Sequence, residues 1–162
     1  MGNDNLGKEA EGKIWEWLDR PDDGYSFTRL YDQMTGYLET SKNICDFICY
    51  KYPNIYYIES KATWNDNFPF SMIADHQRKG LLEKSKIKGC FGWVIVLFAS
   101  YKRAFILDIN DIDELEKTKN QHSLNIKKIA KWPIRYKEIQ TIPNNRKKHL
   151  DYTGELEDYL DD

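Results

Sequence analysis

Two segments rich in β-branched and aromatic residues lie close together near the middle of the chain: Ile44–Tyr50 (ICDFICY) and Ile55–Thr63 (IYYIESKAT). Such residues favour strands, and the Pro-Asn turn between the two segments favours a reversal of the chain. The sequence therefore predicts an antiparallel hairpin, and the rest of the fold can be worked out on either side of it.

The register of this hairpin brings charged residues together. If Tyr50 pairs with Ile55, Asp46 stands opposite Glu59, with their Cβ atoms about 5 Å apart on one face of the sheet. Lys61 follows Glu59 by two positions and shares that face. A slip of one residue would break the alignment, so the prediction depends on the register.

The flanking sequence predicts a mixed α/β (α+β) domain. A helix is expected over residues 6–18, capped by Asn5, and a second helix over residues 71–86. Residues 25–31 are expected to be extended, and residues 91–100 and 104–109 to form a second hairpin whose first strand is buried. Asn110 or Asp111 is expected to cap a short helix over residues 113–118. The remaining expectations are loops over residues 32–43 and 64–70, a turn or strand over residues 125–130, and weak patterning beyond residue 132.

Length and composition limit the classes of protein. The chain has 162 residues, 41% hydrophobic and 31% charged, which suits one globular domain over residues 1–150. Residues 151–162 carry six acids and no base, and are expected to form an acidic tail. The start of the chain lacks a signal-peptide pattern, and no apolar run approaches the ~20 residues of a membrane span. Three cysteines without metal-ligand spacing indicate reduced thiols, so we expect a cytoplasmic protein with no membrane partner.

The charge is distributed unevenly along the chain. The net charge is −2, yet residues 117–149 hold ten Lys or Arg and one acid, Glu138. A basic block interleaved with aromatic residues suits contact with phosphates, although lysine-rich surfaces that only face solvent are equally common.

Paired carboxylates beside a lysine are typical of metal-dependent phosphodiester hydrolysis. Asp46 and Glu59 would repel each other unless a cation neutralised them, and Mg²⁺ prefers such carboxylates together with water and phosphate oxygens. Lys61 could then orient a water molecule or stabilise charge on the phosphate. The alternative is a surface strand with a Glu–Lys pair and an unrelated aspartate.

Several motifs occur together in one order: Asp46, Glu59-Ser60-Lys61 followed by a threonine, Phe68-Pro69-Phe70, and His76-Gln77. This order and spacing resemble the PD-(D/E)xK nuclease superfamily, and most of all the RecU-type Holliday junction resolvases of Gram-positive bacteria and their phages. Gly7-Lys8-x-x-Glu11 resembles the N-terminal helix of that family, and Arg29-Leu30-x-Asp32 another short family element. The resemblance covers roughly residues 5–110 and implies a restriction-endonuclease-like nuclease core with flanking helices.

The resemblance also implies roles for individual residues. Asp46 and Glu59 would bind the metal together with the Ser60 carbonyl, and Lys61 would be the catalytic lysine. The implied cofactor is Mg²⁺, for which Mn²⁺ can substitute. Glu11, with Glu9 as its competitor, would lie near the metal, and Gln77 would support the site. The expected DNA contacts are Arg29, Trp64, His76, Arg78, Lys79, Lys127, Lys128, Arg146, Lys147 and Lys148; His76 could instead be a base or a plain helix-surface residue.

The function implied is that of a homodimeric, structure-selective DNA endonuclease that resolves Holliday junctions by paired symmetric nicks with 5′-phosphate ends. Two departures leave alternatives open. Only thirteen residues, 33–45, separate the arginine element from Asp46, so the projecting stalk of the family is shortened or absent. Ile44 and Cys45 also stand where small or hydroxyl residues are usual. The alternatives are cleavage of flaps, forks or duplex DNA, and a non-catalytic DNA-binding protein on the same fold.

Overall fold

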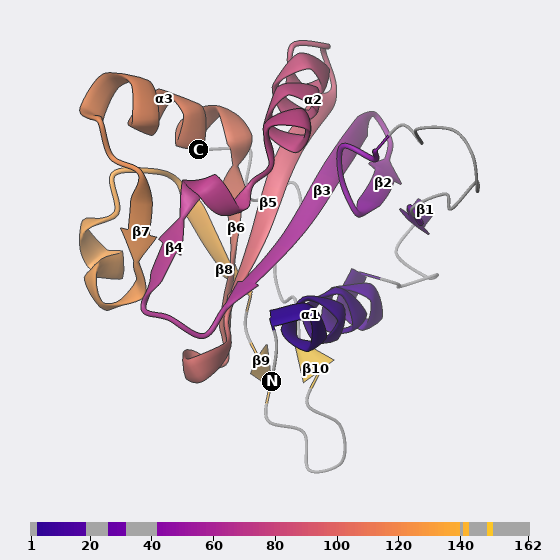
Figure 1. Cartoon of the computed structure of the whole chain (residues 1–162). Coiled ribbons are helices and arrows are strands. Elements are labelled where there is room, and N and C mark those ends of the chain that lie inside the picture. Colours follow the sequence, from indigo (N-terminus) through magenta and orange to yellow (C-terminus); the bar gives the residue numbers. More distant parts are fainter. Residues whose placement is uncertain (1–2, 19–25, 32–41, 140, 143–148, 151–162) are drawn as a thin grey trace, which may run out of the picture.

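A twisted six-stranded sheet forms the centre of the protein, with helices on both of its faces (Figure 1). This arrangement comes from a computed structural model, which describes residues 3–18, 26–31, 42–139, 141–142 and 149–150. The strand order is β1-β2-β3-β5-β6-β8. β3 and β5 run parallel, and the other neighbouring strands run antiparallel. The expected mixed α/β class with flanking helices is therefore confirmed.

The elements of the main sheet and its helices follow one another along the chain. Their bounds are α1 (Asn3–Leu18), β1 (Ser26–Arg29), β2 (Phe47–Lys51), β3 (Asn54–Thr63), α2 (Asp75–Ser85), β5 (Cys90–Phe98), β6 (Arg103–Asp108), α3 (Ile109–Lys119) and β8 (Tyr136–Ile139). Two small two-stranded sheets join β4 (Asn67–Pro69) to β7 (Ser123–Asn125) and β9 (Thr141–Ile142) to β10 (His149–Leu150). Short 3-10 turns cover Phe70–Met72, Ala99–Tyr101 and Ile126–Lys131. None of the helices in the described ranges has the length and apolar character needed to cross a membrane.

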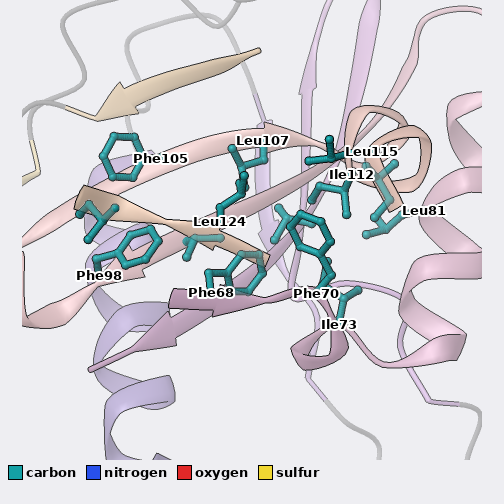
Figure 2. Close-up of a cluster of buried hydrophobic side chains, with 14 of the residues drawn as sticks. Phe68, Phe70, Ile73, Leu81, Phe98, Phe105, Leu107, Ile112, Leu115 and Leu124 are labelled. Atoms are coloured by element: carbon teal, nitrogen blue, oxygen red, sulfur yellow. The ribbon is translucent and has the colours of Figure 1, made fainter. Parts of the chain in front are cut away.

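Alternation along the strands divides the core into two layers. On one face, Ala10 and Ile14 of α1 pack on Phe47, Ile58 and Trp93. On the other face, α2, α3 and the β4–β7 ribbon cover a second cluster, part of which is drawn in Figure 2. Because β5 and β6 contribute to both clusters, their near-continuous apolar sequence is that of strands buried on both sides.

The predicted register of the first hairpin is confirmed. Tyr50 pairs with Ile55 and Ile48 with Tyr57, and the ladder continues to Phe47 opposite Ile58. One further pair, Lys51 with Asn54, shortens the connecting turn to two residues. The second hairpin, β5 with β6, is also present as predicted.

Several expectations about local structure were wrong. Residues 64–70 contain β4, because Phe68 is buried and its strand pairs with β7. Residues 136–139 form β8, an edge strand of the main sheet, although the sequence beyond residue 132 shows little pattern. Helix α3 begins at Ile109 and is capped by Asp108, whose carboxylate accepts a hydrogen bond from the Asn110 amide, and α1 begins before its expected cap at Asn5.

Some predictions concern residues outside the described ranges. These are most of the loop over residues 32–43, the basic run Arg146-Lys147-Lys148 and the acidic tail over residues 151–162.

Candidate active site

Asp46 lies immediately before β2, where the hairpin ladder has ended. Its amide still donates to the Ile58 carbonyl (3.0 Å), but Asp46 and Glu59 do not form the strand pair that the register predicts. Instead, Oδ2 accepts hydrogen bonds from both the amide (2.8 Å) and the hydroxyl (2.7 Å) of Ser60. The Asp46 carbonyl accepts from the Leu30 amide (2.7 Å), which ties this bend to the end of β1. Both hydrogen bonds from Ser60 fall on one oxygen, Oδ2, and hold the carboxylate in place.

Glu59 is a buried carboxylate, with 2% of its surface exposed. Its Oε1 accepts from Lys61 Nζ (2.7 Å) and from Gln77 Nε2 (2.7 Å). Its Oε2 is buried and has no hydrogen-bond partner among the described residues. Burial first, and then the nearby charge of Asp46, raise the pKa of Glu59 from 4.5 to about 8. In the metal-free protein, Glu59 therefore keeps its proton up to about pH 8, because burial and the charge of Asp46 oppose its ionisation more than Lys61 and Gln77 favour it.

Gln77 connects the other two side chains from the first turn of α2. Its Oε1 accepts from the Ala74 amide (3.1 Å) at the helix start and from Lys61 Nζ (3.1 Å). Because two donors hold this oxygen, the Gln77 Nε2 group is turned toward Glu59. The amide thus serves as a cap for α2 and as a support for the Glu59–Lys61 pair.

Close packing between α2 and the segment before β2 sets the position of Gln77. Gly80 lies three residues after Gln77, on the same face of the helix, and touches Ile44. A Cβ atom at Gly80 would lie 2.3 Å from Ile44 Cγ2, so only glycine permits this approach. The unusual isoleucine at position 44 is therefore matched by a glycine across the interface, a pairing that we did not predict.

Cys45, the second departure from the family pattern, is also accommodated. Its thiol is buried and donates to the Phe47 carbonyl (3.3 Å). Burial, reinforced by the charge of Glu59, raises its pKa to about 12. Cys45 is consequently neutral and packs as a small apolar residue beside the acidic pair.

Glu11 and Arg29 form an ion pair between α1 and β1, and both side chains are partly buried. Arg29 pairs in register with Phe47, and the next residue, Leu30, binds the Asp46 backbone. Arg29 also lies over the Tyr31 ring (5.0 Å). Glu11 is thus linked through Arg29 to the strand whose end binds the Asp46 backbone.

The residues at this site fit a divalent cation. The unpartnered Glu59 Oε2 and the second oxygen of Asp46 offer two hard oxygen ligands, and a cation there would relieve the charge repulsion that raises the pKa of Glu59. Within the described ranges, no group of three or more His, Cys, Asp or Glu side chains could hold a metal. Water or phosphate oxygens would therefore complete the shell, as Mg²⁺ prefers.

The predicted DNA contacts fall into different environments. Trp64, His76, Lys79, Lys127 and Lys128 are exposed, and Lys127 forms an ion pair with Asp66 (2.6 Å). Arg78 is used inside the protein, because its guanidinium pairs with Glu116 of α3 and donates to the Phe70 carbonyl (3.3 Å).

The site thus brings together the buried Glu59, the partly buried Asp46 just before β2, Lys61 two residues along β3 and Gln77 from the next helix. The RecU family model, described as Recombination protein U, matches residues 28–158. The chain therefore belongs to the RecU family. This confirms the resemblance drawn from the sequence motifs, and with it the prediction of a nuclease that resolves Holliday junctions by hydrolysing phosphodiester bonds.

Among solved structures, the fold is similar to that of Hjc, a Holliday junction resolvase from the archaeal hyperthermophile Archaeoglobus fulgidus. The TM-score is 0.48 at 11% identity, and the match covers 77% of this chain and 89% of that chain. No curated protein sequence matches the chain.

Proposed function

We propose that this protein is a Mg²⁺-dependent endonuclease that cuts four-way DNA junctions by paired symmetric nicks, with Asp46, Glu59 and Lys61 as its catalytic centre. The observation that supports this most strongly is the unpartnered, buried Oε2 of Glu59 beside Asp46. A buried carboxylate without compensation is costly to keep in a folded protein. A bound cation would give that oxygen a partner and would explain why a carboxylate is buried at this position.

In the proposed mechanism, Asp46 and Glu59 hold the cation, and the Ser60 carbonyl is an additional ligand. The cation supplies Lewis-acid chemistry for phosphodiester hydrolysis. The hydrogen bonds of Ser60 to Asp46 keep that carboxylate in place before the cation binds. Glu59 would hold the cation in its ionised form, so its carboxyl would have to release its proton to solvent.

Lys61 Nζ is the charged donor of the site. It lies 2.7 Å from Glu59 Oε1 and 3.1 Å from Gln77 Oε1, so the ammonium group has two fixed acceptors. We assign Lys61 to orient the attacking water and to stabilise charge on the phosphate, as a preorganised donor does in a water-poor site. Gln77 acts as a positioning residue, because it holds the lysine through Oε1 and Glu59 through Nε2.

A four-way junction requires two symmetric cuts, and a two-fold homodimer supplies two sites. We therefore include a homodimer in the proposal. Exposed basic residues, among them Lys79, Lys127 and Lys128, would contact phosphates of the junction arms.

The decisive experiment compares wild type, Lys61→Ala and Lys88→Ala on end-labelled four-way junctions, flaps and linear duplexes, each with Mg²⁺ and with EDTA. Lys88 is an exposed lysine in the turn before β5, and serves as the control for loss of one positive charge. We expect symmetric junction nicks from wild type and Lys88→Ala. Loss of one preorganised donor should slow Lys61→Ala by roughly 10²- to 10³-fold while binding persists.

The other arms test the alternatives. Preferential cutting of flaps or duplex DNA would retain the catalytic site and replace the junction as substrate, an outcome motivated by the short segment between Arg29 and Asp46. Binding without cutting in Mg²⁺ or Mn²⁺ would show instead a DNA-binding protein on a nuclease fold. A steep fall of affinity with salt would identify phosphate contacts in either case.

A further inference from the structure

Trp64 is the largest exposed apolar side chain in the described part of the protein. It follows the last residue of β3, and 56% of its surface is exposed. No ring contact, ion pair or side-chain hydrogen bond within the described ranges engages its indole. Single exposed apolar residues are ordinary on protein surfaces, so exposure alone assigns Trp64 no role.

The backbone that carries Trp64 is held from several sides. The Ser100 hydroxyl donates to the Trp64 carbonyl (2.6 Å), and the next amide, of Asn65, donates to the Thr63 hydroxyl (3.1 Å). One residue further, the Asp66 carboxylate accepts from Tyr101, and its carbonyl accepts from the Ile126 amide (2.9 Å). Contacts from two other parts of the chain thus fix a loop whose main exposed feature is a tryptophan.

Trp64 lies close along the chain to Lys61, the residue that the proposed function places at the cleaved phosphate. Trp64 follows Lys61 by three residues, a span of roughly 10 Å along a strand. Successive bases of one DNA strand are ~3.4 Å apart along a duplex. The backbone span between Trp64 and Lys61 is therefore comparable to the length of about three nucleotides.

The charges around Trp64 also suit a nucleic acid strand. Asp66, two residues after Trp64, pairs with Lys127 at 2.6 Å, while Lys102 and Lys128, in the turns that contain or follow the loop's hydrogen-bond partners, are exposed. A positively charged border beside an exposed aromatic ring is the usual arrangement for binding unpaired strands, where bases stack on the ring regardless of sequence.

We propose that Trp64 is a stacking platform for an unpaired nucleobase one to three nucleotides from the cleaved phosphodiester. This inference rests on the proposed function, because it takes Lys61 as the point of cleavage. Stacking would select DNA whose bases are free to unstack near the cut, as at a branch point, over continuous duplex. Trp64 would then contribute to substrate choice, while Lys61 and the carboxylates carry out the chemistry.

The test uses tryptophan fluorescence and binding in EDTA, where no cleavage occurs. Wild type and Trp64→Phe are titrated with a four-way junction and with a linear duplex of the same arms, and the difference between the two proteins isolates the signal of Trp64. We expect this signal to be quenched by the junction and little changed by the duplex. Loss of one stacked base corresponds to roughly a 5- to 150-fold weaker affinity, so Trp64→Ala should weaken junction binding by such a factor. Trp64→Phe should retain most of the affinity.

Tyr52→Ala is the matched control. Tyr52 is an aromatic residue with 79% of its surface exposed, and it lies in the turn at the other end of β3, roughly 30 Å away along the strand. Its loss should leave junction binding unchanged. Thermal unfolding of each variant checks that the loop change has not altered the fold.

Four results would overturn the inference. Two concern binding: equal quenching by junction and duplex, and unchanged junction affinity in Trp64→Ala. The third is a loss of self-association in Trp64→Ala by sedimentation, which would make Trp64 a protein-contact residue. The fourth is junction cleavage by wild type without quenching, which would refute the stacking role and leave the proposed function intact. If the junction quenches Trp64 but no substrate is cleaved, the proposed endonuclease function would be wrong, while the stacking site would be supported.

Discussion

Removing the charge of Glu59 should stabilise the metal-free protein at pH 8, even though the same change should abolish cleavage. Below pH 4.5, Glu59 is protonated in both the folded and the unfolded chain, and its ionisation makes no difference to stability. Between pH 4.5 and 8, the unfolded chain releases the proton while the folded chain, in which the pKa is about 8, retains it. The free energy of unfolding then falls by about 1.4 kcal/mol per pH unit.

The size of this effect follows from the pKa of Glu59. The interval from 4.5 to about 8 corresponds to a loss on the order of 4 kcal/mol at pH 8, relative to pH 4.5. Because 98% of the Glu59 surface is buried, solvent does little to screen this cost. For a chain of this length, such a loss lowers the melting temperature by roughly 8 to 16 °C.

The assay is thermal unfolding in EDTA from pH 5 to 8 for wild type and for Glu59→Gln, whose amide cannot ionise. We expect the wild-type melting temperature to fall with pH and that of Glu59→Gln to stay nearly level, so that the variant is the more stable protein at pH 8. The variant also corrects for every other group that titrates in this range. Saturating Mg²⁺ should recover the wild-type stability at pH 8 and leave the variant unchanged. A level wild-type profile, or a variant less stable than wild type at pH 8, would refute the reasoning.

Three further predictions concern the supports of the site. Gln77→Ala should reduce the cleavage rate by about 10- to 100-fold with junction affinity retained, as for the loss of a supporting residue. Single-turnover kinetics would measure the cleavage rate. A change in junction affinity with no change in that rate would contradict the prediction. Gly80→Ala should displace α2 from Ile44 and reduce cleavage. The double variant Gly80→Ala/Ile44→Ala, which makes room for the added methyl group, should regain cleavage activity. If it does not, the contact between Gly80 and Ile44 does not set the position of the helix. A double-mutant cycle of Glu11→Gln and Arg29→Gln, measured by urea unfolding, should give a coupling energy of about 1 kcal/mol, because the pair is partly buried. A coupling energy near zero would mean that the ion pair does not help to hold α1 on β1.

The strands were predictable because their signals are local. Alternation and β-branched residues identified β3, and a Pro-Asn turn fixed its register with β2, so the pairing of Tyr50 with Ile55 followed without tertiary information. β4 and β8 had no comparable signal. Each is short, and each becomes a strand by pairing with a distant partner, as Phe68 does opposite Leu124. Their formation depends on tertiary contacts that a local pattern does not encode.

The candidate site was predictable in its members but not in its hydrogen bonds. Glu59 and Lys61 share a face because strand alternation requires it. The chain bends at Asp46, however, and the carboxylate binds Ser60 instead of standing opposite Glu59. A register predicts residue pairs only as far as both strands continue, and the local sequence does not mark Phe47 and Ile58 as the last pair of β2 and β3.

The supports of the site come from elements that the sequence places far apart. Gln77 reaches Glu59 because a glycine one turn later lets α2 approach Ile44, and the segment that carries Asp46 is held by β1. Each contact joins a residue of the candidate site to the packing of the sheet, so the same folding that buries the core also places Glu59 next to the charge of Asp46. Ionised Glu59 thus carries a cost in the folded chain, which a bound cation would offset. Metal affinity and stability at neutral pH are for this reason two measurements of one interaction, and a variant that changes one should change the other in the opposite sense.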